Sequence, residues 1–278
     1  MRLVARSFHV LSLSRAAEHL AQASLPPRSL VLTFDDGYAD NVEVALPILQ
    51  RHGLTASFFV SSGFLDGGRM WNDSVIECLR ASTRSGLDLG ELGVATAVPL
   101  QTLEQRQQAV QLLLPQIKYL NLEQREVALA RLQSLCGVAT LPKDLMMSTA
   151  QLRSLHKAGM EIGGHTVSHP ILTTLDGEQA EREIALGRER LQELIDQPVQ
   201  VFAYPNGKPG QDYDASHVAL VRRLGFRAAV STAAGAAGAG ADLFQLPRYT
   251  PWAKGLPLWA ARLALNQRRR RYDMAVAA

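Results

Sequence analysis

The 278-residue sequence has few features of disulfide-bonded or membrane-spanning proteins. It contains only two cysteines, Cys78 and Cys136, and neither belongs to a CxxC or CxxH pattern. We therefore expect two core thiols in a reducing compartment rather than a disulfide or a thiolate metal site. No window approaches ~18 uninterrupted apolar residues, so the sequence predicts no transmembrane span.

Neither sign of charge dominates the chain. The formal net charge of +3 gives no argument for nucleic acid as a partner. Much of the basic excess lies in the run Arg268 to Arg271, which begins a basic tail of residues 268–278. We expect a solvated tail, with peripheral membrane contact through anionic lipid or phosphate as the alternative. The first residues are interrupted by Arg6, His9 and Arg15, so they do not form a secretory signal, and we expect a cytoplasmic protein.

Strand-like and helix-like segments alternate along most of the chain. With 47% hydrophobic and 20% charged residues, the composition is that of a globular enzyme. This alternation predicts βαβ units around a parallel sheet, hence an α/β fold. A helix with one apolar stripe is expected over residues 178–196 and a shorter one over 44–53. Strands are expected over residues 29–34, 55–61, 160–164, 199–204, 226–231 and 243–249.

Residues 66–147 interrupt this alternation. The segment is helical in composition and contains no convincing strand. We interpret it as a helical insertion within a single domain that spans residues 1–278. A second irregular segment, residues 231–242, consists mainly of alanine and glycine and predicts a flexible loop.

Polar side chains follow two of the predicted strands. Asp35 and Asp36 come directly after the strand of residues 29–34. Two adjacent carboxylates at the end of an apolar strand persist if they are solvated, protonated or neutralised by a cation. His165 and His169 follow the strand of residues 160–164, and two histidines with a carboxylate are a common ligand set for catalytic zinc. Histidines at this spacing are more often ordinary loop residues, but ends of neighbouring parallel strands lie close together.

Two further motifs follow later strands. The sequence FAYPNG, residues 202–207, ends in the turn dipeptide Asn206–Gly207. It is either a structural turn or a loop that offers a backbone N–H to a developing oxyanion. Arg248 follows Pro247 at the end of the last predicted strand, where it could form an ion pair with Asp35 and keep that carboxylate ionised.

The motifs TFDDGYADN, HTVSHP, FAYPNG and LPR, in this order, resemble those of the NodB-type polysaccharide deacetylases, carbohydrate esterase family 4, in its FAYP-motif branch. The resemblance extends from about Leu11 to Trp252 and is interrupted by the insertion. It implies a distorted (β/α) barrel. It also implies removal of N-acetyl groups from amino sugars with a divalent metal, usually Zn²⁺, although Co²⁺, Ni²⁺ or Mn²⁺ could occupy such a site.

The resemblance also implies roles for individual residues. Asp36, His165 and His169 match the metal ligands of the family, and Asp35 matches the general base that takes a proton from the attacking water. The backbone N–H of Asn206 matches the oxyanion donor. Arg248 resembles the residue that orients the base in the FAYP branch, because the motif arginine of other members is replaced by Ala203. Substrate contacts are expected from Tyr38, Thr166, Tyr204 and Pro205.

One expected residue has no counterpart in the sequence. Many members of the family use a late histidine as general acid, but the only histidine after His169 is His217, which we expect on the surface of a helix. The leaving amine would then receive its proton from water, from Asp35 once protonated, or from a residue of the insertion. Trp71, at the start of the insertion, is either a platform for a sugar ring or a structural aromatic residue.

The sequence therefore predicts a metal-dependent hydrolase that removes N-acetyl groups from an amino sugar in a cell-surface polysaccharide or its precursor. The substrate would be an N-acetylated glycan or a lipid-linked sugar. One alternative is a hydrolase of another C–N bond, in a formamide or a ring amide. The other is a catalytically silent glycan-binding module, which the missing histidine favours and the intact aspartates and histidines oppose.

Overall fold

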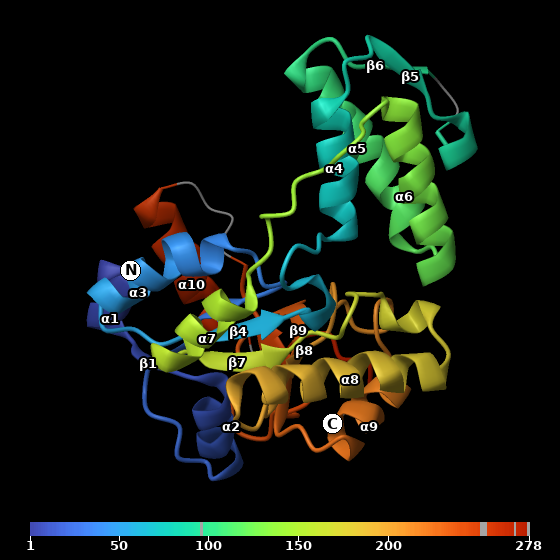
Figure 1. The fold of residues 1–278 in the computed structure, drawn as a ribbon. Coiled ribbons are helices and arrows are strands. Elements are labelled where there is room, and N and C mark those ends of the chain that lie inside the picture. Colours follow the sequence, from blue (N-terminus) through green and yellow to red (C-terminus); the bar gives the residue numbers. More distant parts are fainter. Residues whose placement is uncertain (95–96, 251–254, 270, 277–278) are drawn as a thin grey trace. The chain divides into compact units, whose positions relative to one another are not determined.

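The computed structural model describes residues 1–94, 97–250, 255–269 and 271–276 (Figure 1). Trp252 of the last motif and Arg270 of the basic run lie outside the described residues. The chain divides into two compact units: Met1–Leu65 together with Met147–Ala278, and Asp66–Met146. The predicted assignment of the whole chain to one domain stays a prediction. Among the described residues, no helix is long and apolar enough to cross a membrane.

The first unit is built on two parallel sheets (Figure 1). The smaller sheet pairs β1 (His9–Leu11) with β2 (Ser29–Val31). The larger sheet has six strands in the order β10-β9-β8-β7-β4-β3, and all of its pairings are parallel. Its strands are β3 (Thr33–Phe34), β4 (Ser57–Val60), β7 (Glu161–Gly164), β8 (Val201–Ala203), β9 (Ala228–Ala234) and β10 (Leu246–Arg248). The α/β prediction is therefore correct.

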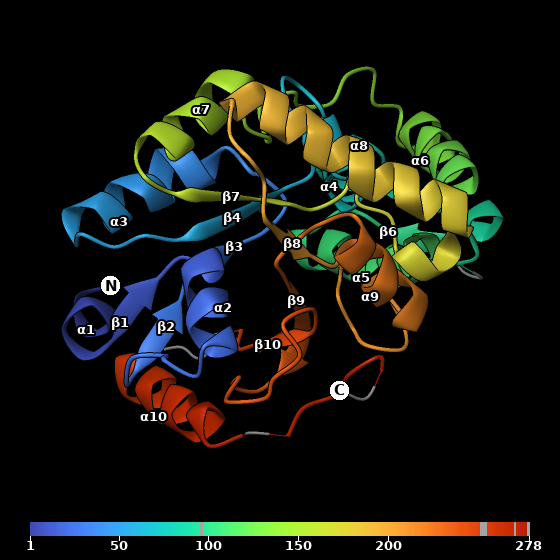
Figure 2. The same cartoon turned by 90° about the horizontal axis from the view of Figure 1, so that it is seen from below.

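Helices surround the curved larger sheet. Figure 2 shows α3, α7 and α8 together on one side of β4 and β7. The helices of this unit are α1 (Arg2–Ser7), α2 (Leu13–Ala21), α3 (Leu46–Arg51), α7 (Thr149–Lys157), α8 (Gly177–Ile195), α9 (Ala215–Arg223) and α10 (Leu256–Gln267). Three single turns complete the unit: the π-helical η1 (Asn41–Ala45), and the 3₁₀ turns η2 (Ser62–Phe64) and η4 (Leu172–Thr174).

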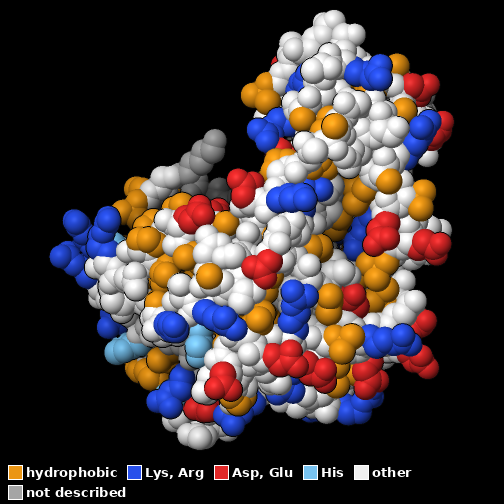
Figure 3. Space-filling model, viewed as in Figure 1, with side chains coloured by type: hydrophobic (Ala, Val, Ile, Leu, Met, Phe, Trp, Pro, Cys, Tyr) orange, Lys and Arg blue, Asp and Glu red, His pale blue; other side chains and the backbone are white. Residues whose placement is uncertain are grey.

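Helix α8 follows the sequence prediction closely. Asp176 begins the helix with a capping box, and Ile184 and Leu191 of the apolar stripe are fully buried. On the outer face Arg182 forms an ion pair with Glu178 at 2.9 Å. Charged side chains of both signs are accordingly interspersed over this helix in Figure 3. The charged face of α8 is thus turned to solvent, and its apolar face packs on the rest of the unit.

The predicted strand of residues 29–34 is divided between the two sheets. Its first half, β2, pairs with β1, and its second half, β3, pairs with β4. At Leu32 the carbonyl oxygen accepts a hydrogen bond from Ser57 N at 2.9 Å, which directs the chain from one sheet to the other. An apolar strand carries no sequence mark for such a change of partner, so the prediction of one continuous strand is wrong.

Two further expectations for this unit need correction. Strand β1 was not predicted, because only three residues form it. The segment of residues 231–242 was expected to be a flexible loop, but β9 continues to Ala234 and pairs there with Arg248 of β10. Ser231 and Ala233 are buried while Thr232 is exposed, so the strand alternates even among small side chains.

The second unit consists of three helices and a hairpin: α4 (Trp71–Ala81), β5 (Gly86–Asp88), the turn η3 (Gly90–Leu92), β6 (Ala97–Pro99), α5 (Leu103–Lys118) and α6 (Leu122–Cys136). The expectation that this segment contains no strand is wrong, because β5 and β6 form an antiparallel pair. Within the two strands, only Leu87 and Val98, which face each other, are buried. Strands this short do not produce a recognisable alternation.

The core of the second unit contains Trp71 and both cysteines. The Trp71 ring is buried, and the guanidinium of Arg125 lies 5.7 Å from its centre. Its burial fits the structural role and not the predicted sugar platform. Both thiols are free, as expected; burial raises the pKa of Cys78 to about 11 and that of Cys136 to about 12, so both stay protonated.

The two edge strands of the larger sheet, β3 and β10, are not hydrogen-bonded to each other. We call the gap between them the seam. Side chains of α2 and α10, among them Leu13 and Leu263, line a cavity of about 300 Å³ along it, together with residues of β2 and β10. The sheet is thus a curled, incompletely closed barrel.

A close approach at Gly163 of β7 gives a test of the packing. A Cβ atom there would lie 2.6 Å from Cε1 of Phe59 and 3.0 Å from Cγ2 of Val201. We expect Gly163→Ala to lower the free energy of unfolding by about 1–3 kcal/mol, measured by denaturant titration. Gly177→Ala is the control, because an added Cβ meets no atom within 4 Å at the start of α8. Equal stability of the two variants would contradict the packing.

Candidate metal centre and active site

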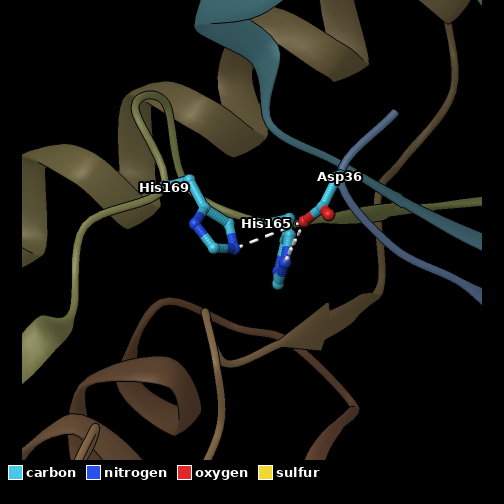
Figure 4. Close-up of side chains that lie close together, drawn as sticks. All are labelled: Asp36, His165 and His169. Atoms are coloured by element: carbon cyan, nitrogen blue, oxygen red, sulfur yellow. Dashed lines mark ion pairs between the residues drawn. The ribbon is translucent and has the colours of Figure 1, made fainter. Parts of the chain in front are cut away.

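Asp36, His165 and His169 converge at the ends of two strands (Figure 4). Asp36 follows β3 and His165 follows β7, while His169 lies in the loop that leads to η4. Oδ1 of Asp36 is 3.3 Å from Nε2 of each histidine. The three candidate ligand atoms all lie within 4.8 Å of one another. Strand β4 lies between β3 and β7, so the two strands are not direct neighbours as expected, yet the side chains still meet.

The chemistry of these residues fits a divalent cation. His165 Nδ1 lies 2.7 Å from the carbonyl oxygen of Ala203, so this nitrogen donates a proton and Nε2 is the ring nitrogen that faces Asp36. On losing its proton, Nε2 would offer its lone pair to a cation. The His165 side chain is 1% exposed, whereas that of Asp36 is 26% exposed. Two imidazole nitrogens and one carboxylate oxygen, open to solvent on one side, are the donor set of a catalytic zinc site.

The loop between the two histidines is held by its own side chains. Thr166 Oγ1 accepts a hydrogen bond from His169 N at 3.1 Å and donates one to the carbonyl oxygen of His165. The Thr166 residue is 1% exposed. The predicted substrate contact of Thr166 does not fit this burial; its hydroxyl instead fixes the distance between the two candidate ligands.

Side chains of helix α8 also hold the loop between His165 and His169. Glu183 accepts hydrogen bonds from Val167 N at 2.9 Å, from Ser168 N at 2.8 Å and from Ser168 Oγ at 2.7 Å. One turn later, a Cβ at Gly187 would lie 2.8 Å from the carbonyl carbon of Thr166, so only glycine lets the helix approach. None of the sequence motifs includes Glu183; the glycine four residues later, inside a helix, is the one signal in the sequence that points to it.

We expect Glu183→Gln to weaken metal binding, because the amide loses the charge and one acceptor that hold the loop. The dissociation constant for Zn²⁺, measured by competition with a chromogenic chelator, should rise about tenfold. Glu178→Gln on the exposed face of the same helix is the matched control and should bind Zn²⁺ like the parent. Unchanged affinity in Glu183→Gln would show that the histidine loop holds its conformation without this carboxylate.

Asp35 forms the ion pair predicted with Arg248. Arg248 Nη1 lies 2.7 Å from Oδ1 of Asp35, and Nε donates to the carbonyl oxygen of Ser231 at 2.9 Å. Burial alone would raise the pKa of Asp35, but the charges of Arg248 and of the imidazoles outweigh it and lower the pKa below its ordinary value of 3.8. Asp35 is therefore an ionised carboxylate directly beside Asp36, the residue that faces both histidines.

Asp36 is ionised for a different reason. Burial again acts to raise its pKa, while the hydrogen bond to His165 and the charge of His169 lower it below 3.8. The adjacent charge of Asp35 opposes this shift. The two neighbouring aspartates thus stay ionised with separate partners, Arg248 for one and the histidines for the other, which answers how two carboxylates can follow an apolar strand.

The FAYPNG motif places two of its predicted substrate residues inside the protein. Tyr204 is fully buried, stacks on Tyr213 with ring centres 3.9 Å apart and donates its hydroxyl to the carbonyl oxygen of Phe244. Pro205 is also buried. Substrate contact by the side chains of Tyr204 and Pro205 is therefore not compatible with the structure, because both rings pack in the protein interior at the end of β8. Tyr38 is half-buried, and its predicted contact stays a prediction.

Asn206 occupies a turn that keeps it beside β9. Its carbonyl oxygen accepts a hydrogen bond from Thr232 Oγ1 at 2.8 Å. The following Gly207 accepts one from Thr232 N at 2.9 Å. Among the described residues no acceptor binds the N–H of Asn206. The role of this N–H as oxyanion donor stays a prediction.

Backbone strain occurs in these loops. Of the eight non-glycine residues with positive φ in the described part of the chain, four lie here: Asp36 at 76°, Thr166 at 65°, His169 at 52° and Asn206 at 58°. For threonine and histidine this conformation costs roughly 1 kcal/mol or more, and such residues cluster at functional sites. These four strained positions are all residues singled out from the motifs; the other four, Ala23, Arg28, Asp66 and Asp196, are not.

The surface position expected for His217 is wrong. His217 is buried in the first turn of α9, where its ring contacts the carboxylate of Asp214 at 2.8 Å as part of a capping box. The side chain folds back over the helix end because a residue at this position satisfies the N-cap N–H. It serves the helix and is not the missing general acid.

A sequence model with the description "Polysaccharide deacetylase" matches residues 22–113 and 130–229. The chain belongs to the polysaccharide deacetylase family. A curated relative, YxkH of Bacillus subtilis, is named after the same family and is 20% identical over 242 residues. The match covers 87% of this chain but only 58% of the length of that relative.

Solved structures of deacetylases share the fold. The deacetylase PplD of Streptococcus pyogenes, in complex with acetate, has a TM-score of 0.56 at 20% identity, with 89% of this chain and 75% of that chain covered. IcaB of Ammonifex degensii has a TM-score of 0.56 at 19% identity, with 95% and 85% covered. The prediction of a distorted (β/α) barrel of the polysaccharide deacetylase type is therefore confirmed, and the assignment to the FAYP branch stays a prediction.

Proposed function

We propose that this protein is a metal-dependent hydrolase that removes N-acetyl groups from an amino sugar in a cell-surface polysaccharide or its precursor. Membership of the polysaccharide deacetylase family supports the reaction class. The observation that carries the proposal is the pair of ionised aspartates: Asp35 is held by Arg248, and Asp36 faces His165 and His169. A base beside a cation site is what hydrolysis of an unactivated amide requires.

Asp36, His165 and His169 would hold the cation. A divalent ion of the zinc class, when bound, polarises an amide carbonyl and lowers the pKa of water. His165 is oriented for this by the carbonyl of Ala203, and the 165–169 loop is held by Glu183. Both histidines are buried, so their ring positions are set before any ligand arrives.

Asp35 takes the proton from the attacking water. Arg248 keeps this carboxylate ionised and orients it through the 2.7 Å contact. The N–H of Asn206 donates a hydrogen bond to the carbonyl oxygen as negative charge develops on it. Once protonated, Asp35 returns the proton to the leaving amine, a route that needs no late histidine.

We expect Arg248→Ala to slow turnover about 10- to 100-fold, because Asp35 loses the charge that lowers its pKa and the contact that orients it. Metal content should not change, since Arg248 contacts none of the candidate ligands. The measurements are the steady-state rate and the metal content of the same preparation. Arg223→Ala, which removes a surface ion pair with Glu181, is the control. Wild-type rates for Arg248→Ala would remove it from the site.

The test of the proposed function is acetate release from N-acetylglucosamine oligomers and from a panel of lipid-linked N-acetylated sugars. A formamide and a ring amide are assayed in parallel, on purified protein of known metal content. Release that requires both metal and Asp35 supports the deacetylase. Release from the small amides alone identifies a different C–N hydrolase, and glycan binding without any release identifies a silent binding module.

A further inference from the structure

The outward face of α10 is apolar although nothing in the first unit covers it. Leu258 is 48% exposed and Leu265 is 66% exposed, and their separation of seven positions places both on one side of the helix. Leu256 is 62% exposed, but it lies about 200° around the helix from Leu258 and does not belong to this face. Figure 2 shows α10 at the periphery of the first unit. Two largely exposed leucines on one face of a short helix indicate a surface that contacts something else.

The opposite side of α10 fixes the helix to the barrel. Trp259 packs against the main core and Leu263 is 7% exposed. Asn266 Nδ2 donates to the carbonyl oxygen of Gly235 at 2.9 Å, and Ala236 N donates to the carbonyl oxygen of Arg269 at 2.9 Å. The outward leucines are therefore not needed to hold the helix in place.

The segment that carries this face is predominantly positive, and its first acidic side chain is Asp273. Residues 249–272 contain six cationic side chains and no acidic one: Lys254, Arg262, Arg268, Arg269, Arg270 and Arg271. Arg262 and Arg269 follow Leu258 and Leu265 by four residues each, so they lie beside the leucines on the helix surface. In the described part of the chain, Arg262, Arg268, Arg269 and Arg271 are exposed and form no ion pair.

We propose that α10 and the arginines that follow it are a docking surface for an anionic phospholipid bilayer. Interfacial helices place leucines among the acyl chains and arginines among the headgroup phosphates, which is the distribution found here. A second copy that met this face with its own α10 would present the same positive charge and be repelled. The family match ends at residue 229, so this surface lies outside the region that the chain shares with the family model.

The test is sedimentation of the full chain with vesicles of phosphatidylcholine alone or with added phosphatidylglycerol. We expect binding only to the anionic vesicles, weakened by salt. Arg268→Ser with Arg269→Ser should weaken it about thirtyfold, and Leu258→Ser with Leu265→Ser at least about tenfold. Leu103→Ser with Val127→Ser is the matched control: these side chains are 73% and 66% exposed on helices of the second unit, and their loss should leave binding unchanged.

Three outcomes would overturn the proposal. The first is no binding to anionic vesicles at low salt. The second is an equal loss of binding in the control pair, which would make the effect one of general hydrophobicity. The third is a dimer in analytical ultracentrifugation that Leu258→Ser with Leu265→Ser dissociates while vesicle binding is unaffected, which would assign the face to a second copy. The assay contains no sugar, so its result does not depend on the proposed hydrolase activity.

Discussion

Replacing Asp35 by asparagine is expected to reduce acetate release about 10²- to 10⁴-fold while metal content stays at the parent level. A general base contributes a factor of this size, and asparagine cannot accept the proton of the attacking water. The amide has nearly the shape of the carboxylate, so the loop after β3 keeps its conformation. Metal content is retained because Asp36, not Asp35, faces His165 and His169.

The matched control for this variant is Asp40→Asn. Asp40 belongs to the same motif, is exposed, and forms no side-chain cap to the following turn. Rates for Asp35→Asn and Asp40→Asn are compared on preparations of equal metal content. Activity of the Asp35 variant above about a tenth of the parent rate would assign the proton transfer to another group.

Replacing His169 by alanine is expected to raise the dissociation constant for Zn²⁺ more than about a hundredfold. Loss of a direct ligand exceeds the 10- to 100-fold cost of losing an outer-shell partner. Acetate release should fall in parallel at limiting zinc. The protein should also lose the increase in melting temperature that zinc gives the parent, because a ligand stabilises only the state that binds it.

Two further variants separate ligand loss from a disturbed loop. His169 has a φ of 52°, a conformation that asparagine tolerates better than alanine does, so His169→Asn keeps the loop and still removes the imidazole. His9→Ala removes an exposed histidine of β1 and should bind zinc normally. Zinc affinity at the parent level in His169→Asn would exclude this imidazole from the ligand set.

The candidate site was predictable because its residues follow strands. Local patterns located the strands before Asp36, His165 and Arg248, and carboxyl ends of parallel strands meet at one edge of a sheet. No contact between these residues had to be known in advance. The insertion of β4 between β3 and β7 changed the order of the strands without separating the side chains.

Burial and support could not be predicted in the same way. Tyr204 and Thr166 lie inside sequence motifs, yet both side chains point into the protein. The Tyr204 ring stacks on Tyr213, and the Thr166 hydroxyl accepts a hydrogen bond from His169 N. From the sequence, Glu183 is indistinguishable from the solvent-exposed glutamates of the same helix. Only the packing of α8 against the loop of residues 165–169 reveals its hydrogen bonds. These properties depend on which elements pack together, and no periodicity within one segment encodes that.

The Arg248 ion pair links the two edge strands of the larger sheet, which share no backbone hydrogen bond of their own. Arg248 lies on β10 and contacts both Asp35 and Thr33 of β3, so one guanidinium bridges the two edges of the sheet across the seam. In the proposed function, Asp35 is in position to act as the base only while these edges are held together. Local separation of β3 and β10 would therefore convert molecules from a form able to catalyse the reaction into one that is not. The fraction of molecules in the active form is then set by the same ion pair that holds the two edges together.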